Sequence, residues 1–473
     1  MSRPHSVELP YSTDSATLFA RVAELPWTIF LDSGQPHIGQ GRYDILAADP
    51  GITLTTRGPL TEIHTAAGVE ISTESPYALV RRYLGPVEPS VSGLPFRGGA
   101  MGYFSYDLGR RFERLPVKAA ATDPVPDMAI GIYDWAVVVD HLRRRSQLVA
   151  LGRDPRTLDR WAELCDCFDT SRSVPPVSKP FRVLEAPTSN LSFAQYANAF
   201  HRIKHYIREG DCYQVNLAQC FSAKVEGSLW QAYRVLRSLN PAPFAAFLNT
   251  PYCQILSSSP ERFLRVESGR VETKPIKGTR PRAQDRGIDR AYAQDLRTSV
   301  KDRAENLMIV DLMRNDLGKV CDLGSVTVPK LFDVETYASV HHMVSTVTGK
   351  LRRDCDALAL LQACFPGGSI TGAPKLRAME IIEELEPHRR GVYCGAIGYV
   401  GVDGSMDTNI AIRTLVHSGE TLRFWAGGGI VHDSELEAEY QETLDKVAPL
   451  LSLLKLTESD YVDCEDRRQF IHG

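Results

Sequence analysis

Residues 422–454 read LRFWAGGGIVHDSELEAEYQETLDKVAPLLSLL and carry the clearest structural pattern in the chain. Residues 422–426 favour a buried strand, and three glycines at 427–429 connect it to a helix expected over 434–454. One face of this helix is charged and the opposite stripe is apolar, so the segment predicts a sheet covered by an amphipathic helix. The charged face, at i, i+4, i+7 and i+11, consists of Glu435, Glu439, Glu442 and Lys446.

Strands and helices follow each other irregularly on either side of this segment. Ser192 and Gln195 form a capping-box pattern at the start of a helix. The absence of a regular βαβ order favours an α+β fold over a Rossmann sheet. Further helices are expected at 290–316, with a break near Thr298, and at 374–385. Strands are expected at 27–31, 43–47, 136–140, 392–400 and 410–416, and a pair of strands at 213–218 and 244–248.

Composition changes divide the chain into an N-terminal region, 1–170, and a catalytic region, 191–456. The stretch between them, 171–190, is rich in Pro and Ser and is interpreted as a linker or surface crossing. Residues 457–473 form a C-terminal tail.

The overall composition excludes several classes of protein. The chain has 473 residues, 43% of them hydrophobic, and a net charge of -4, which is ordinary for a globular protein and offers no broad basic field for nucleic acid. No signal peptide and no apolar run long enough to span a membrane are visible. The 10 cysteines are scattered without a CxxC pair, which indicates free thiols in a reducing cytoplasm.

Carboxylates on two of the predicted helices could bind a hard cation. Glu439 and Glu442 share one helical face, and Glu305 precedes a largely apolar run on another helix. Mg²⁺ prefers carboxylate oxygens and retains several waters, so one or two Glu from each helix would suffice. A solvated charged face with an ion pair to Lys446 is the alternative, and it is common on amphipathic helices.

Two glycine-rich segments precede helices. Residues 365–375, FPGGSITGAPK, offer backbone N–H groups and Lys375 to an anion, but a tight turn explains them equally well. The spacing is not that of a phosphate-binding P-loop. The glycines at 427–429 indicate either close approach of the backbone to a ligand or a flexible loop.

Three further side chains have chemistry that could serve a reaction. Glu261 would act as a general acid/base if burial raised its pKa, and Lys277, between Ile276 and Gly278, could be a desolvated nucleophile. Taken separately, each is more often a surface residue. His341 and His342 are adjacent, but neighbours on a strand face opposite ways, so joint metal binding is not expected. His342 alone is a candidate hydrogen-bonding group, and a structural histidine with satisfied hydrogen bonds is the alternative.

Five segments that occur in one order resemble the chorismate-utilising enzymes, the family of the anthranilate, isochorismate, salicylate and aminodeoxychorismate synthases. The resemblance covers about 192–454, and residues 31–34 and 98–108 resemble the N-terminal region of the aminating members. The segments are 259–263 (SPERF), 275–279 (PIKGT), 302–316 (DRAENLMIVDLMRND), 367–375 (GGSITGAPK) and 426–429 (AGGG).

The resemblance implies an α+β sandwich of two large antiparallel β-sheets flanked by helices, with the site between the halves. It implies that Lys277 is a covalent nucleophile, Glu261 the general acid/base and His342 a group near the reacting ring. It also implies Mg²⁺ bound by Glu305 and Glu442, with Glu439 nearby or bound through water. Chorismate contacts are expected from Gly278, Thr279, Ser369, Tyr393, Arg413, Gly427, Gly428, Gly429 and Lys446.

Two positions distinguish members of the family. Gln214 stands where isochorismate and salicylate synthases have the lysine that activates water, which argues against water as the nucleophile. Lys277 stands where anthranilate synthases have alanine, and a lysine there is typical of aminodeoxychorismate synthases. The expected reaction is therefore the conversion of chorismate and ammonia to 4-amino-4-deoxychorismate. There are two alternatives. The chain could be an anthranilate synthase, or it could be a non-catalytic regulatory subunit that binds chorismate or tryptophan.

The resemblance further implies a partner and a second pocket. Ammonia is expected from a separate glutamine amidotransferase subunit, since the family motifs leave little sequence for a fused one. No nucleic-acid or membrane partner is expected. In related aminating enzymes a tryptophan pocket is formed by residues whose counterparts here are Ser33, Arg42, Tyr43, Pro243, Phe244 and Ala245.

Overall fold

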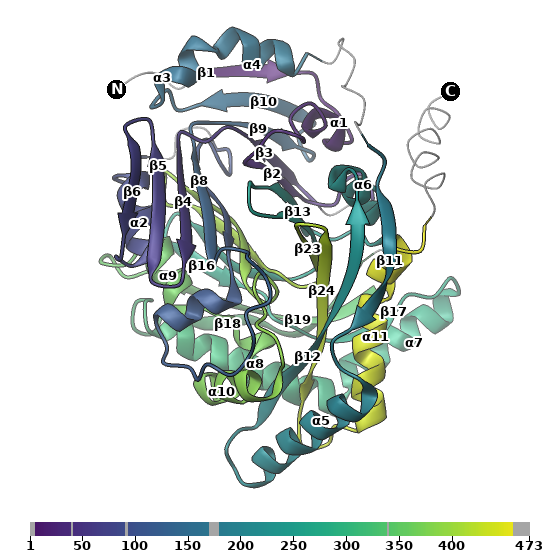
Figure 1. Cartoon of the computed structure of the whole chain (residues 1–473). Helices are drawn as coiled ribbons and strands as arrows, with labels where there is room; N and C mark the ends of the chain where they lie inside the picture. Colours follow the sequence, from purple (N-terminus) through teal and green to yellow (C-terminus); the bar gives the residue numbers. More distant parts are fainter. Residues whose placement is uncertain (1–4, 39–40, 90–92, 170–178, 338–339, 457–473) are drawn as a thin grey trace.

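Two β-sheets carry the fold (Figure 1). The computed structural model describes residues 5–38, 41–89, 93–169, 179–337 and 340–456. Within these ranges each sheet has twelve strands, and neighbouring strands run antiparallel. The expected α+β architecture with two large antiparallel sheets is therefore confirmed.

The first sheet has strands of the N-terminal region at one edge and strands of the catalytic region toward the other. The short strand β20 (Gly372–Ala373) pairs with β12 outside the main path. In spatial order the strands are β1 (His5–Leu9), β10 (Arg145–Ala150), β9 (Trp135–Asp140), β3 (Tyr43–Ala47), β2 (Thr28–Asp32), β13 (Phe244–Asn249), β14 (Gln254–Ser259), β23 (Thr414–Ser418), β24 (Thr421–Ile430), β12 (Gln214–Glu226) and β11 (Arg182–Ser189).

The second sheet runs the other way along the sequence, from the catalytic region to the N-terminal region. Strand β18 (Thr327–Thr336) pairs with β19 outside the main path. In spatial order the strands are β17 (Ile276–Pro281), β19 (Val340–Lys350), β16 (Arg270–Thr273), β15 (Arg262–Glu267), β22 (Met406–Ile410), β21 (Ala396–Gly401), β7 (Gly99–Phe104), β8 (Met128–Tyr133), β4 (Ile52–Arg57), β5 (Leu60–Thr65) and β6 (Gly68–Ser72).

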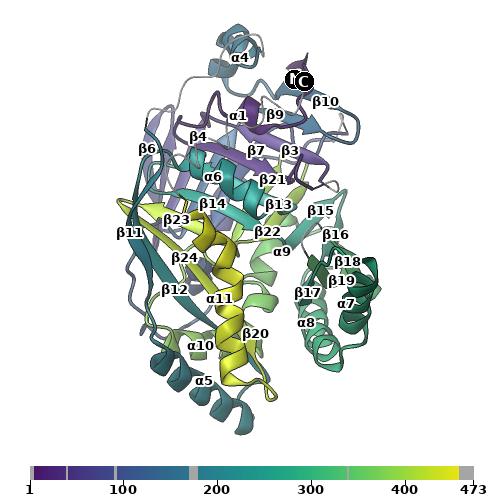
Figure 2. The ribbon, with the colours of Figure 1, turned by 90° about the vertical axis from the view of Figure 1, so that its right-hand side faces the viewer.

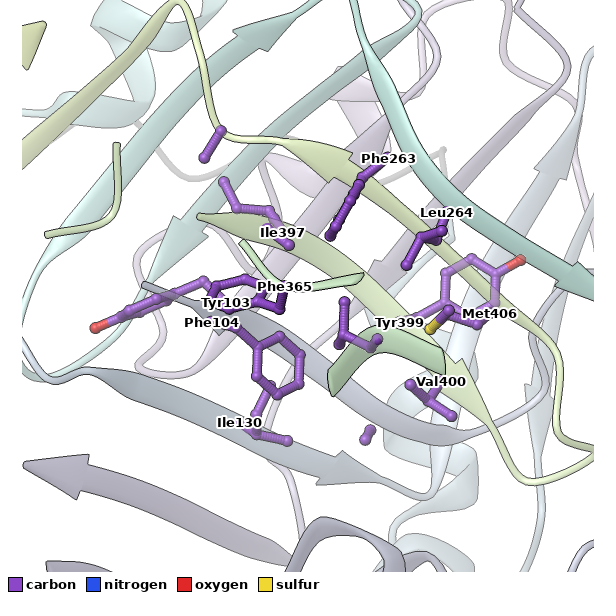
Figure 3. Close-up of a cluster of buried hydrophobic side chains, with 14 of the residues drawn as sticks. Tyr103, Phe104, Ile130, Phe263, Leu264, Phe365, Ile397, Tyr399, Val400 and Met406 are labelled. Atoms are coloured by element: carbon purple, nitrogen blue, oxygen red, sulfur yellow. The ribbon is translucent and has the colours of Figure 1, made fainter. Parts of the chain in front are cut away.

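Both sheets combine strands from the two halves of the sequence. In the first sheet β2 pairs with β13, and in the second β7 pairs with β21. The largest apolar core contains side chains of both sheets, among them Ile29 and Trp425 from the first and Tyr103 and Phe263 from the second. Figure 3 shows part of this cluster. The N-terminal region and the catalytic region thus share one core.

Helices cover the outer faces and one edge of the sandwich. In Figure 2, α11 lies across β24 and β12, while α7 and α8 pack over β17–β19. The helices are α1 (Ala16–Phe19), α2 (Pro76–Leu84), α3 (Pro155–Asp159), α4 (Trp161–Cys167), α5 (Phe193–Arg208), α6 (Leu229–Leu239), α7 (Arg286–Thr298), α8 (Val300–Gly318), α9 (Ala357–Cys364), α10 (Lys375–Leu385) and α11 (Leu436–Leu453), with short 3₁₀ turns η1 (Tyr106–Arg111) and η2 (Gly368–Ile370).

Locally encoded features agree with the sequence prediction. The side chain of Ser192 accepts from the backbone N–H of Gln195, whose own side chain bonds back to the Ser192 backbone, which completes the capping box of α5. The helix predicted over 290–316 is interrupted at Ser299, which caps α8. In the described part of the chain, the cysteines are free thiols and no helix is both long and apolar enough to cross a membrane.

Four predictions about pairing and boundaries need correction. The strand predicted at 410–416 is interrupted, since β22 ends at Ile410 and β23 begins at Thr414. The strands predicted at 213–218 and 244–248 form, but they do not pair with each other, since β12 pairs with β24 and β13 with β2. The glycines at 427–429 are not a connecting loop but continue β24 beside β12. The strand predicted at 392–400 begins only at Ala396.

The stretch interpreted as a linker contains regular structure. Residues 182–189 form β11, an edge strand paired with β12. The remainder of the predicted linker at 171–178, and the C-terminal tail at 457–473, lie outside the described residues.

Candidate active site

Lys277 lies on β17 at an irregularity in its pairing with β19. The next residue, Gly278, has φ +83, and a Cβ there would stand 2.8 Å from Oδ1 of Asp302 on α8. Glycine is therefore required for α8 to pack this closely against β17. The Lys277 ammonium interacts electrostatically with Glu261 and with carboxylates on α8 and α11, so it faces the space between these elements.

Glu261 follows β14 and is 5% exposed, so the surface alternative is wrong for this residue. Burial raises the pKa of Glu261 to about 7. A hydrogen bond from the Ser369 side chain and the positive charge of Lys277 act in the opposite direction. A carboxyl group with a pKa this close to neutrality can both give and take a proton at physiological pH.

His342 on β19 is buried beside β17. Its Nδ1 lies 2.9 Å from Oγ1 of Thr279. Burial, followed by the charge of Arg413, lowers the pKa of His342 to about 4, so the imidazole is neutral at pH 7. His341 faces away, toward Asp289 and Thr336, as expected for adjacent strand residues. His342 can therefore serve as a neutral hydrogen-bonding group.

Arg413 lies between β22 and β23 with φ +52, an uncommon conformation for a residue with a side chain. Its backbone accepts a hydrogen bond from Ser258, which holds this conformation. Burial lowers the pKa of the Arg413 guanidinium, and no other described residue forms a hydrogen bond or ion pair with it. A half-buried guanidinium without a protein partner is suited to the carboxylate of a ligand.

Tyr393 and Trp425 form an aromatic wall near this arginine. Their rings are stacked, with an interplanar angle of 8° and centroids 5.9 Å apart. Tyr393 is 3% exposed, and the ring of a cyclic substrate could lie against such a wall.

Carboxylates from α8 and α11 converge on one cation, the ammonium of Lys301. Lys301 Nζ lies 3.9 Å from Glu305 Oε1 and 3.7 Å from Glu439 Oε1. Burial raises the pKa of both carboxyl groups. Glu439 also accepts a hydrogen bond of 2.6 Å from Ser434, and at 4% exposure it does not belong to a solvated face.

Glu442 has a different environment from Glu439 on the same helix. Its side chain is 48% exposed, and the Lys446 ammonium lies 2.6 Å from Glu442 Oε1. Burial raises its pKa, but Lys446 outweighs this and the net shift is downward. Lys446 also donates to the Gly427 carbonyl at 2.9 Å. The ion pair that the sequence offered as an alternative thus exists, beside the buried carboxylate.

The glycines of β24 allow this helix to approach the sheet. A Cβ on Gly428 would lie 2.8 Å from Glu439 Oε2 and 3.7 Å from Glu442 Oε1. A Cβ on Gly429 would lie 2.9 Å from Cδ, the amide carbon, of the Gln214 side chain. Gln214 is fully buried, and neither polar atom of its side chain has a hydrogen-bond partner within the described structure.

The six residues predicted for a tryptophan pocket all line one cavity of about 740 Å³. It lies between the two sheets, since β2, β3 and β13 line one side and β15, β21 and β22 the other. Arg42 stacks over the Tyr43 ring at 4.5 Å and pairs with Asp140 at 3.2 Å. The hydroxyl of Ser33 donates to Asp44 at 2.6 Å. This cavity is separate from the catalytic candidates.

Sequence reasoning missed two cations of the site. Lys301 precedes Glu305 by four residues on one helix, a spacing that could have indicated its place. Arg390 and Glu386 have the same spacing, but their ion pair is buried, with the Arg390 side chain 1% exposed. Nothing local distinguishes this pair from an exposed one.

A family model described as chorismate binding enzyme matches residues 38–452. The chain belongs to the family of chorismate binding enzymes. It is 50% identical over 456 residues to aminodeoxychorismate synthase component 1 of Salmonella typhimurium, covering 96% of this chain and 98% of that protein. It is 39% identical over 460 residues to anthranilate synthase component 1 of Pseudomonas aeruginosa, covering 93% of each.

Solved structures agree with this assignment. Anthranilate synthase component I of Streptococcus pneumoniae superimposes with a TM-score of 0.77 at 32% identity, covering 87% of this chain and 92% of that one. The menaquinone-specific isochorismate synthase of Escherichia coli superimposes with a TM-score of 0.70 over 96% of this chain and 94% of that one. At 17% identity, the second likeness concerns the fold alone.

Proposed function

We propose that this enzyme converts chorismate and ammonia to 4-amino-4-deoxychorismate and water. One observation carries the proposal: Lys277 lies within electrostatic reach of the buried Glu261, whose pKa burial raises to about 7. The relatives named aminodeoxychorismate synthase component 1, at 47–50% identity, support the same reaction. Relatives named anthranilate synthase component 1 match at 36–39%.

Two displacements describe the chemistry. In the first, the Lys277 ammonium loses a proton to solvent and the resulting amine forms a bond to C2 of the ring. The ring double bonds shift, and the C4 oxygen departs as water with a proton from Glu261. In the second, ammonia bonds to C4, the double bonds shift back, and the C2–N bond to Lys277 breaks. Glu261 near pKa 7 is suited to donating the proton and later regaining one.

The residues around Lys277 would hold the substrate in place. Arg413 would bind a carboxylate of chorismate through its unpaired guanidinium. The pair formed by Thr279 and His342 would contact a ring oxygen, since His342 is neutral and is held in place by Thr279 and by the backbone of Gly278. The Tyr393 ring would pack against the substrate ring.

Mg²⁺ fits the acidic cluster of α8 and α11. Glu305 and Glu439 already share a cation, the Lys301 ammonium, and Glu442 stands beside them. No three metal-ligating side chains in the described ranges are close enough to hold a metal alone, so water and substrate oxygens would complete the coordination. The ion would neutralise the ring carboxylate of chorismate while Lys301 turns toward solvent.

Ammonia would come from a glutamine amidotransferase partner. The relative from Streptomyces griseus named aminodeoxychorismate synthase is 40% identical over 442 residues, which is 90% of this chain but 60% of that protein. That relative therefore carries additional sequence, which supports a second component acting with this chain.

The cavity between the sheets is where we expect tryptophan to bind. Arg42 and the aromatic rings of Tyr43 and Phe244 suit a zwitterion with an indole side chain. Calorimetric titration with tryptophan tests this, with Tyr43→Ala as the variant that should lose binding. Unchanged affinity in that variant would place the amino acid elsewhere.

A product assay tests the proposed reaction. The purified chain is incubated with chorismate, Mg²⁺ and a high concentration of ammonium at alkaline pH. We expect 4-amino-4-deoxychorismate, which an added lyase converts to 4-aminobenzoate. Fluorescent anthranilate formed without the lyase would identify an anthranilate synthase instead. No turnover under any supply of ammonia would favour a non-catalytic binding subunit.

Mass spectrometry after incubation with chorismate tests the covalent step. An adduct should form on Lys277 and be absent in Lys277→Ala. Lys301→Ala serves as the control, because this neighbouring lysine lies among carboxylates but is not assigned a bond to the substrate. Retention of the adduct in Lys277→Ala would exclude Lys277 as its site.

A further inference from the structure

Arg390 is the centre of a buried network beside the site. Its side chain is 1% exposed, and it forms a bidentate pair with Glu386, with Nε to Oε2 at 2.9 Å and Nη2 to Oε1 at 2.7 Å. Its Nη1 donates to the carbonyl of Ile370 at 2.8 Å. Its Nη2 also donates to the backbone carbonyl of Asn216 at 3.1 Å and to the Asn216 side chain at 3.2 Å.

Arg390 contacts two parts of the site, the η2 turn through Ile370 and the aromatic wall through Tyr393. Ile370 follows Ser369, whose side chain bonds to Glu261. The Arg390 guanidinium also lies 5.7 Å from the centre of the Tyr393 ring and 4.9 Å from that of Tyr106. The cation therefore connects the η2 turn and the aromatic wall through one rigid planar group.

The network joins β12, the end of α10 and the η2 turn, in addition to the backbone pairing of β12 with β20. Glu386 caps the end of α10 and also accepts from the backbone N–H of Ala218 on β12 at 2.9 Å. Asn216 lies on the same strand, two residues earlier. Removal of Arg390 would leave the Ile370 carbonyl and Glu386 without their principal donor in a buried place.

We propose that Arg390 is a positioning residue that holds Ser369 against Glu261 and Tyr393 against the substrate ring. This inference rests on the proposed function, because it concerns the groups assigned to that reaction. It goes beyond that function in assigning a role to a residue that does not touch the substrate.

The signature of this role is a change at Glu261. The groups that act on Glu261 are the Lys277 and Lys446 ammonium groups, the Ser369 hydroxyl and the backbone N–H of Ile276, and the Cys394 thiol is also within electrostatic reach. The Ser369 hydrogen bond opposes the rise of the Glu261 pKa caused by burial. If Ser369 moves away, this pKa rises, and activity that needs the protonated acid persists to higher pH.

The test compares pH profiles of kcat for Arg390→Lys, Ser369→Ala and the double variant. We expect the falling limb above neutral pH to move upward by about one pH unit in each single variant, the scale of one hydrogen bond to a carboxylate. The double variant should show no further movement, because both changes act through one contact. In Arg390→Lys, kcat should also fall at least about tenfold, as misplaced catalytic groups cause.

Arg237→Lys is the matched control. Arg237 is equally buried, at 1% exposure, and is paired with Asp32 and Asp14, none of which is among the groups that act on Glu261. This control should lose thermal stability while its falling limb stays at the wild-type pH. If Arg390→Lys behaves in the same way, its role is structural only and the proposal is overturned.

Two further measurements keep the test decisive. Should Arg390→Lys not fold, Arg390→Met combined with Glu386→Gln removes both charges together and retains an acceptor oxygen for Ala218. Should the wild type form no 4-amino-4-deoxychorismate, the proposed function fails, and calorimetry with chorismate then judges Arg390. Weaker chorismate binding in Arg390→Lys but not in Arg237→Lys would support the positioning role, and equal binding in both would refute it.

Discussion

Gly428→Ala tests whether the approach of α11 to β24 creates the cation site. The new Cβ would stand 2.8 Å from Glu439 Oε2, against 3.4–4 Å for ordinary contact. The carboxylate would therefore have to retreat by at least about 0.6 Å, because β24 is held between β12 and β23. Retreat would also strain the 2.6 Å hydrogen bond from Ser434.

The expected cost of this overpacking is about 1–3 kcal/mol. If that cost falls on the metal-bound arrangement, the Mg²⁺ concentration for half-maximal activity rises about 5- to 150-fold. The assay measures product formation against Mg²⁺ at saturating chorismate and ammonium, together with thermal unfolding.

The control for this prediction is Gly318→Ala at the end of α8, where a Cβ would meet no atom within 4 Å. It should leave the Mg²⁺ requirement unchanged and the stability equal or slightly higher. A lower unfolding temperature in Gly428→Ala with an unchanged Mg²⁺ requirement would refute the reasoning, because Glu439 would then have moved without consequence for the metal.

Three other substitutions have definite expected outcomes. Lys301→Met removes the ammonium that lies between Glu305 and Glu439, so half-maximal activity should need about two- to fivefold less Mg²⁺ in the same titration. The gain is modest because the Lys301 side chain is 54% exposed and its charge is screened by solvent. Glu261→Gln should abolish turnover yet stabilise the fold. The free energy of unfolding should rise by up to about 3 kcal/mol above pH 7 and by little near pH 4.5. Denaturant unfolding at both pH values measures this difference. The sign follows because the folded pKa of Glu261 is raised, so wild-type stability is lost as pH increases toward 7. His342→Asn should lower kcat/KM without removing any limb between pH 5 and 9, since His342 is already neutral there; a lost limb would contradict this.

Locally encoded structure was largely predictable from the sequence. The capping box of Ser192 and Gln195 and the break before α8 depend on residues only a few positions apart. The pairing of β12 with β24 instead joins residues about two hundred positions apart, and no local pattern contains that information. For the same reason, the sequence predicts a connection at the glycines 427–429, although pairing with β12 extends the strand through them.

Residue types indicated the catalytic candidates, but only the fold determines their chemistry. Glu261 and Lys277 each looked like ordinary surface residues when taken separately. The environment of Glu261 depends on Ser369, more than a hundred residues later in the sequence, and on β17, which begins about fifteen residues later. The Arg390 network was not predictable, because an i,i+4 ion pair has the same sequence pattern whether it is exposed or buried.

The last helix shows why spacing alone could not decide between a metal site and a solvated face. Glu439 and Glu442 lie on the same face of α11, yet one is 4% exposed and the other has a side chain 48% exposed. Gly428 permits the burial of Glu439, since a side chain on β24 at that position would occupy the space that Glu439 uses. The helix pattern and the glycine motif are therefore two halves of one feature. Neither half alone predicts a buried carboxylate, and a substitution in either should disturb the same cation.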